Sequence, residues 1–179
     1  MNNHRIFTIP NFFSLVRIFL VIPIYYYISI DKNSIALVYV VLAFVSDGLD
    51  GYLARRLNQV SDVGKILDPV ADKICTSGAF IALSIFQGLP LWITTVIIAR
   101  DIIIILGSIL LIERKKIVTP SNYLGKITVT IISFFAISIL LKLDVLYQPL
   151  LISVIILLSL SLFYYAIIFI KNLKNDVHA

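Results

Sequence analysis

Four aspartates, set in a stretch that is otherwise almost free of charge, are the residues of this chain best suited to chemistry. They are Asp47, Asp50, Asp68 and Asp72. The apolar runs on either side, residues 36–45 and 79–86, carry no charged side chain. Acidic side chains inside or beside a membrane-spanning segment are costly, so a group of them marks a functional site. At helical spacing, these four predict a metal site at a membrane surface.

The spacing places each half of this stretch on one face of a helix. At about 100° per residue, four residues of the first half lie within about 80° of Asp47. They are Asp50, Gly51, Ala54 and Arg55. Three residues of the second half follow one another at intervals of four and form one stripe. They are Gly64, Asp68 and Asp72. Two helices that face each other in this way would bring four carboxylates into one pocket.

The composition of this pocket predicts its cofactor. Neighbouring carboxylates repel one another, and a divalent cation relieves the repulsion. Oxygen ligands without His or Cys suit hard ions, so we expect Mg²⁺ or Mn²⁺. Two such ions roughly 4 Å apart could hold a diphosphate and stabilise its leaving oxygen. Arg55 is a suitable phosphate partner, while Gly51 and Ala54 let a ligand or another helix approach the backbone.

The elements that must position these residues are membrane-spanning helices. Of the 179 residues 60% are hydrophobic and 14% are charged, and the mean hydropathy is +1.01. A helix needs roughly 20 apolar residues to cross a bilayer. Six segments have that length or nearly so, at residues 12–30, 34–54, 66–86, 90–112, 122–141 and 147–170. We therefore expect an all-α integral membrane protein with six transmembrane helices, forming a single domain over residues 1–179.

The basic residues indicate how this bundle is oriented. Most of them lie at the helix ends that six spans would place on one side. The positive-inside rule then puts both termini and the aspartates on the cytoplasmic side of the inner membrane. The formal net charge of +5 agrees with this topology and with contact to anionic lipid, and no separate basic tract indicates nucleic-acid binding. Cys75, the single cysteine, excludes an intrachain disulfide and a cysteine metal cage.

A polar stripe near the N-terminus allows two interpretations. Pro10 and Asn11 are typical of a helix start, and Asn11, Ser14 and Arg17 then recur at intervals of three. In the favoured interpretation they form the polar edge of a short interfacial helix that faces lipid headgroups. In the other, they reach the active site.

The aspartates and their neighbours carry a family resemblance. The pattern D-x2-D-G-x2-A-R-x8-G-x3-D-x3-D, running from Asp47 to Asp72, matches at every fixed position and resembles the signature of the CDP-alcohol phosphatidyltransferases. The resemblance covers nearly the whole chain in length, span count and motif placement. It implies six transmembrane helices and a homodimer whose site opens at the cytoplasmic interface.

The same resemblance implies an activity and a role for each motif residue. The four aspartates would hold two divalent metal ions, and Asp72 would also be the general base. Gly51, Ala54, Arg55 and Gly64 would line the pocket for the CMP part of CDP-diacylglycerol. An alcohol would attack the lipid-side phosphorus and release CMP, in a displacement dominated by positioning and charge neutralisation.

The acceptor alcohol is a narrower question. Arg100 beside Asp101 lies in the middle of the fourth span, and Lys126 begins the fifth. We expect Arg100 and Lys126 to bind an acceptor phosphate, although a structural pair between Arg100 and Asp101 is the alternative. Short matches resemble both the phosphatidylglycerophosphate synthases and the cardiolipin synthases of this fold, and the basic pair favours glycerol 3-phosphate because it suits a phosphate dianion. The stretch 104–108 departs from the phosphatidylglycerophosphate synthases because it has no second arginine, which favours the cardiolipin synthase branch and phosphatidylglycerol. Inositol phosphate, serine and choline are less favoured acceptors.

A cation transporter is the alternative from another class, with the aspartates as a translocation site. Transporters often show repeated halves and helices broken near the midplane. The sequence shows neither feature and places its carboxylates near one membrane face, so the enzyme is favoured.

Overall fold

The computed structural model describes residues 9–56, 64–115 and 123–174, and the side chains of residues 11–48, 67–107 and 123–168 within them. All of the described secondary structure is helical. In chain order the helices are α1 (Ile9–Ser29), α2 (Asn33–Arg56), α3 (Gly64–Phe86), α4 (Leu91–Lys115), α5 (Tyr123–Leu140) and α6 (Asp144–Lys174). The expectation of an all-α protein with six helices is confirmed.

Most of these helices begin and end close to the predicted residues. Gly88, in a left-handed conformation with φ of 73°, precedes Pro90 and the start of α4, as the Gly-Leu-Pro sequence indicates. The sixth span was expected to begin at residue 147, and the structure begins it three residues earlier. The helix α6 begins at Asp144, and Pro149 lies inside it. A chain reversal just before Asp144 explains the earlier start.

That reversal is a Schellman turn, and the same turn joins α1 to α2. In the link between α5 and α6 the N–H of Leu143 donates to Ser138 O at 2.9 Å and that of Lys142 to Ile139 O at 3.0 Å, while Lys142 has φ of 53°. In the link between α1 and α2 the N–H of Lys32 donates to Tyr27 O at 2.9 Å and Asp31 has φ of 57°. Both turns satisfy carbonyls at a helix end and reverse the chain within three residues.

Several helices are long and apolar enough to cross a membrane. Within the described residues, four segments meet that criterion by length and composition: Asn11–Ser29, Leu67–Phe86, Tyr123–Leu140 and Asp144–Ile168. The described part of α2 adds a shorter apolar helix, Asn33–Gly48. Large apolar side chains such as Phe19, Phe44 and Phe163 are exposed, as expected for surfaces that contact lipid. The chain is a multi-pass membrane protein.

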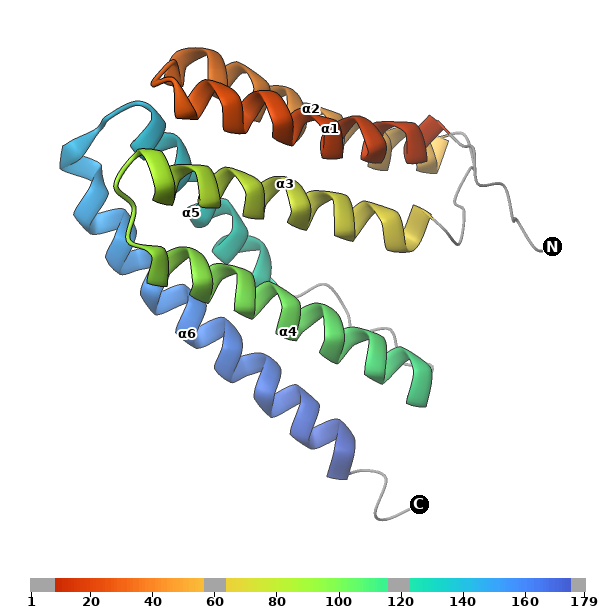
Figure 1. Ribbon diagram of the computed structural model, residues 1–179. Coiled ribbons are helices and arrows are strands. Elements are labelled where there is room, and N and C mark those ends of the chain that lie inside the picture. The colour runs from red at the N-terminus through yellow and green to blue at the C-terminus, as the bar shows by residue number, and fades with distance from the viewer. Residues whose placement is uncertain (1–8, 57–63, 116–122, 175–179) are drawn as a thin grey trace. The chain divides into compact units, whose positions relative to one another are not determined.

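The chain divides into two compact units, Met1–Thr94 and Thr95–Ala179. In the first unit α1 packs against both α2 and α3 (Figure 1). Its core includes Ile24 and Ile28 of α1, Ala36 of α2 and Phe80 of α3. Because α1 contacts both of the other helices, a side chain on its inner face can reach residues of either one.

The end of the first unit away from Asp47, Asp68 and Asp72 is held by hydrogen bonds of side-chain amides. Asn33 Nδ2 donates to Asp31 Oδ1 at 3.3 Å and to Gln87 Oε1 at 3.2 Å. Gln87 Nε2 donates to Asp31 Oδ1 at 3.2 Å. These contacts attach the turn between α1 and α2 to the end of α3.

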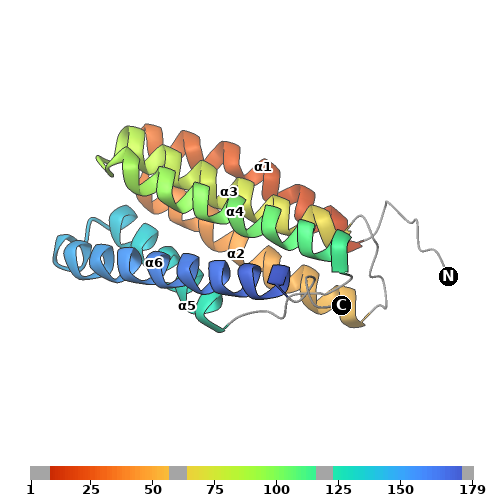
Figure 2. The same ribbon diagram turned by 90° about the horizontal axis from the view of Figure 1, so that it is seen from below.

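In the second unit α5 packs against α6, and the two helices lie side by side in Figure 2. Phe135 and Ile132 of α5 and Val154 and Leu158 of α6 are buried. The part of α4 that belongs to this unit contributes Arg100, which is described below with its hydrogen bond to α6.

Candidate functional site

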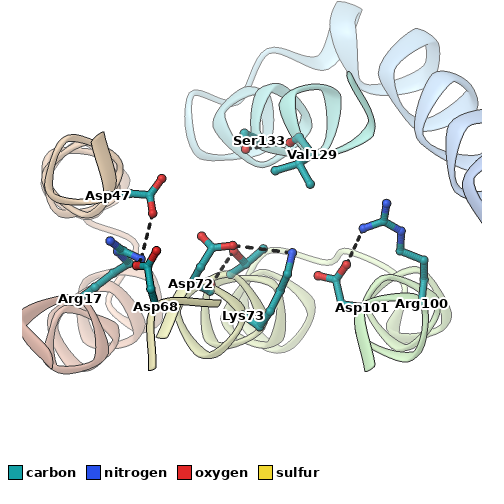
Figure 3. A network of polar contacts seen from close by, with 10 residues as sticks. Arg17, Asp47, Asp68, Asp72, Lys73, Arg100, Asp101, Val129 and Ser133 are labelled. Atoms are coloured by element: carbon teal, nitrogen blue, oxygen red, sulfur yellow. Dashed lines mark hydrogen bonds and ion pairs between the residues drawn. The ribbon is translucent and has the colours of Figure 1, made fainter. Parts of the chain in front are cut away.

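The two halves of the acidic motif meet at one arginine. Arg17 Nη1 of α1 lies 3.0 Å from Asp47 Oδ1 of α2 and 3.1 Å from Asp68 Oδ1 of α3 (Figure 3). The guanidinium therefore bridges carboxylates from two different helices. Aspartates that lie far apart in the chain are adjacent in space, as the helical spacing predicts.

The N-terminal polar stripe faces this site. Asn11, Ser14 and Arg17 are 4%, 2% and 1% exposed, and all three belong to α1 itself. Ser14 Oγ lies 3.5 Å from Asp68 Oδ1, to which it donates a weak hydrogen bond. The favoured interpretation of these residues as the edge of an interfacial helix is therefore wrong. They are buried because α1 contacts both motif helices, and the alternative orientation, toward the site, is the one observed.

Asp72 lies one turn beyond Asp68 on α3. Its Oδ2 is 3.6 Å from Lys73 Nζ (Figure 3), and its backbone carbonyl accepts a hydrogen bond from Thr76 Oγ1 at 2.9 Å. Asp68 and Asp72 are both close enough to Asp47 for their charges to act on it. The three carboxylates are 40–47% exposed whereas Arg17 is 1% exposed. An accessible acidic surface thus has a buried cation beneath it.

The remaining motif residues have a described backbone only. Asp50, Gly51, Ala54 and Arg55 lie in the last turns of α2, and Gly64 is the first residue of α3. Their side chains lie outside the described residues, so their roles stay predictions. Among the described side chains, no group of three or more Asp, Glu, His or Cys residues is close enough together to hold a metal ion. Asp50, the fourth expected ligand, is not among the described side chains that this statement covers.

The donor set nevertheless has the chemistry of a hard-cation site. Asp47, Asp68 and Asp72 contribute carboxylate oxygens and are partly exposed, and a positively charged group already lies between two of them. Such oxygens are the ligands that Mg²⁺ and Mn²⁺ prefer. The residues present therefore fit a divalent cation in type.

A second buried polar cluster lies in the second unit. Arg100 Nη1 is 2.6 Å from Asp101 Oδ1 (Figure 3), and Nη2 donates to Ser161 Oγ at 2.8 Å. Arg100 and Asp101 are 3% and 7% exposed. The pair that the structural alternative required is therefore present. Arg100 Nε is buried and has no hydrogen-bond partner among the described residues.

The other basic residue expected to bind the acceptor is Lys126, which is exposed in the first turn of α5. Its neighbour Gly125 faces Arg100, because a Cβ at Gly125 would lie 3.9 Å from Arg100 Nη2. Lys126 therefore follows in sequence a residue that lies beside Arg100, and the common role of Arg100 and Lys126 stays a prediction. Ser161, which the sequence analysis did not single out, completes this cluster from α6.

An all-helical membrane protein with acidic side chains converging from two helices is the class that these observations define. Residues 7–170 match the family model described as CDP-alcohol phosphatidyltransferase. The chain belongs to this family, and the resemblance drawn from the aspartates is confirmed. It is a transferase of phospholipid biosynthesis. The family uses CDP-diacylglycerol and an alcohol acceptor, and is generally dependent on divalent metal ions.

Its relatives carry two different names. The CDP-diacylglycerol–glycerol-3-phosphate 3-phosphatidyltransferase of Aquifex aeolicus is 38% identical over 133 residues, which cover 73% of this chain and 74% of that protein. The protein of the same name in Bacillus subtilis is 36% identical and covers 68% of this chain and 70% of its own length. The CMP-forming cardiolipin synthase of Streptomyces coelicolor is 35% identical and covers 68% of this chain and 60% of its own length. Both expected branches are represented among these relatives.

Proposed function

We propose that this enzyme transfers the phosphatidyl group from CDP-diacylglycerol to glycerol 3-phosphate and releases CMP. The observation that carries the proposal is the Arg17 bridge, which joins Asp47 of α2 to Asp68 of α3 in one acidic site. A transporter would also bind cations at carboxylates, but it gives no reason for the family motif around them.

Each motif residue has a proposed role in this reaction. Asp47, Asp50, Asp68 and Asp72 hold two divalent ions, Mg²⁺ or Mn²⁺, which when bound neutralise the diphosphate and the leaving phosphate. Asp72 accepts the proton of the acceptor hydroxyl. The hydroxyl oxygen forms a bond to the lipid-side phosphorus, and the bond from that phosphorus to the bridging oxygen breaks. CMP leaves with that oxygen.

The nucleotide pocket is proposed from the motif residues that flank the aspartates. Gly51, Ala54 and Gly64 leave room for the CMP part of the lipid, and Arg55 pairs with a phosphate. Their location supports this role. Gly51, Ala54 and Arg55 follow Asp47 on α2, and Gly64 precedes Asp68 on α3.

Two basic residues of the second unit support an anionic acceptor. Lys126 is exposed at the start of α5, and Arg100 Nε is buried with no hydrogen-bond partner among the described residues. A phosphate monoester such as glycerol 3-phosphate is matched by such a pair. Phosphatidylglycerol is the second candidate acceptor, because residues 104–108 contain no further arginine and a cardiolipin synthase is among the similar proteins.

The proposed setting is the inner membrane, with the acidic site at the cytoplasmic face and two copies of the chain in a homodimer. The distribution of basic residues in the sequence supports this orientation. Labelling of single cysteines placed at residues 32 and 143, in a Cys75→Ala background, would test it. Both residues are exposed, residue 32 in the turn between α1 and α2 and residue 143 in the turn between α5 and α6.

An acceptor assay tests the proposed reaction directly. The purified protein in nanodiscs with CDP-diacylglycerol and Mg²⁺ is offered glycerol 3-phosphate, phosphatidylglycerol, inositol phosphate or serine in separate reactions, and CMP is measured. We expect release with glycerol 3-phosphate. Release with phosphatidylglycerol alone would assign the second candidate. No release with any acceptor, from a folded protein, would contradict the proposed function.

A matched pair of lysines tests the acceptor site. Lys126 lies in the first turn of α5 and Lys142 just beyond its last residue, and both are exposed. Lys126→Asn should raise the KM for glycerol 3-phosphate about tenfold, the loss expected for one charge-assisted contact, with the KM for CDP-diacylglycerol unchanged. Lys142→Asn removes the same charge at the other end and should change neither constant. Equal effects of the two variants would exclude Lys126 from the acceptor site.

A further inference from the structure

Arg17 is a charged side chain in a place where charge is costly. It lies within α1, an apolar helix long enough to cross the membrane, and is 1% exposed. A buried guanidinium in such a segment requires anionic partners. Its partners are two carboxylates of the acidic motif, Asp47 and Asp68.

The geometry of these contacts resembles that of a bridging cation. A single nitrogen, Nη1, lies 3.0 Å from Asp47 Oδ1 and 3.1 Å from Asp68 Oδ1. These two carboxylates are also among those proposed as metal ligands. A divalent ion that bridged them would neutralise the same pair of charges, so the two cations would occupy overlapping positions.

We propose that Arg17 is an internal counter-ion of the metal site. It neutralises Asp47 and Asp68 when no metal is bound, and a divalent ion must displace it from at least one of them. This inference rests on the proposed function, because it takes these aspartates as metal ligands. It predicts that Arg17 stabilises the metal-free protein and weakens metal binding.

The inference would be overturned if Arg17 instead oriented the metal ligands. An arginine that kept Oδ1 of each carboxylate while the metal used Oδ2 would orient the ligands, and its loss would weaken metal binding, as is typical of residues that orient metal ligands. If Arg17 is a counter-ion that competes with the metal, its loss has the opposite effect on metal affinity. Its loss removes a positive charge within about 3 Å of two ligands and should strengthen metal binding.

Mn²⁺ binding to the purified full chain in nanodiscs shows whether loss of Arg17 strengthens or weakens metal binding. The measurement does not require turnover. Free Mn²⁺ is followed by electron paramagnetic resonance, and thermal unfolding by a thiol-reactive dye at the buried Cys75. For Arg17→Gln we expect a lower unfolding temperature without metal, a larger rise when Mn²⁺ is added, and a Kd for Mn²⁺ about tenfold lower or more. An unchanged or higher Kd would overturn the inference.

Two further variants make the test specific. Lys32→Gln removes an exposed positive charge from the turn between α1 and α2 and should leave the Kd unchanged, so an equal effect there would indicate net charge alone and overturn the inference. Should Arg17→Gln fail to fold, Arg17→Lys takes its place. Its single ammonium cannot reproduce the guanidinium bridge, and we expect a Kd severalfold lower than that of the natural protein. An unchanged or higher Kd would again overturn the inference.

The natural protein separates this inference from the proposed function. If it binds Mn²⁺ and loses that binding in Asp47→Asn and Asp68→Asn, the metal assignment stands whatever Arg17 does. If it binds no Mn²⁺ even with CDP-diacylglycerol present, both fail together. If it binds Mn²⁺ and Arg17→Gln does not bind it more tightly, the counter-ion role alone fails.

Discussion

Gly78 of α3 packs directly against Val21 of α1. A Cβ at position 78 would overlap Val21 Cγ1, and the other two nearest atoms also belong to the Val21 side chain, at 3.7 and 3.8 Å. The absence of a side chain at Gly78 therefore lets α1 and α3 approach closely. This approach is part of the packing that brings Arg17 of α1 within reach of Asp68.

Gly78→Ala should destabilise the protein by about 1–3 kcal/mol, the usual cost of an extra methyl group in a packed interface. Thermal unfolding in detergent, followed by dye reaction with Cys75, measures the change. Val21→Ala should recover much of the loss in the double variant, because it removes the overlapping methyl group. Gly107→Ala is the matched control, since no atom of the described residues lies within 4 Å of a Cβ there. A Gly78→Ala variant as stable as the Gly107→Ala variant would contradict this account of the helix contact.

Asp68→Asn and Asp72→Asn should each lower CMP release by at least about 100-fold, since each removes a charged group proposed to act at the transition state. The protein should stay folded, because both side chains are nearly half exposed and Arg17 keeps Asp47 as a partner in Asp68→Asn. CMP release and the unfolding temperature are measured together. Asp144→Asn, at an exposed residue in the first turn of α6, should retain full activity. Near-normal turnover in either motif variant would refute its proposed role.

Arg100→Gln should raise the KM for the acceptor about tenfold and that for CDP-diacylglycerol by less than about threefold, if the guanidinium binds the acceptor. Steady-state kinetics with each substrate varied in turn gives both constants. Ser161→Ala removes the hydroxyl that accepts from Nη2 and should cost about 1–2 kcal/mol of stability, as expected for a hydrogen bond to a charged group. Equal changes in both KM values for Arg100→Gln would instead assign Arg100 a structural role with Asp101.

Lys142→Gly should stabilise the protein by up to about 1 kcal/mol, because glycine adopts the left-handed conformation of this turn without the penalty that a side chain incurs. The φ of 53° at Lys142 is the basis for this expectation. Lys142→Val should lower stability, since a β-branched residue is least suited to positive φ. The unfolding temperatures of the two variants are compared. If both moved in the same direction, the turn conformation would not control stability here.

The helices were predictable because local features define them. Apolar runs of sufficient length, with Pro10 near one start and Gly88 and Pro90 before another, are read directly from neighbouring residues. The sixth span was expected from residue 147, two residues before Pro149, because proline is typical of a helix start. The turn that ends at Leu143 is closed by backbone hydrogen bonds around Lys142, and side-chain types gave no sign of it.

Helical spacing predicted which aspartates share a helix face, but not all of their contacts. It aligned Asp68 with Asp72. The pair of Arg100 with Asp101 was the alternative interpretation of Arg100, and the structure contains that pair. Arg17 was assigned to the membrane surface because its spacing reveals a common face with Asn11 and Ser14 but not what that face contacts. The cost of burying an arginine in an apolar helix was the available signal, and it required an acidic partner elsewhere in the chain.

The two ends of the first unit are held by different kinds of contact, and Asn33 and Gln87 hold one of them through their amides. At that end neutral amides donate to Gln87 Oε1 and Asp31 Oδ1, so these hydrogen bonds should respond less to ionic strength than an ion pair does. At the other end the helices are joined through ion pairs of Arg17 with Asp47 and Asp68, which dissolved ions weaken. Changes in salt should therefore loosen or tighten the three helices around Arg17 more than they affect the end held by Asn33 and Gln87.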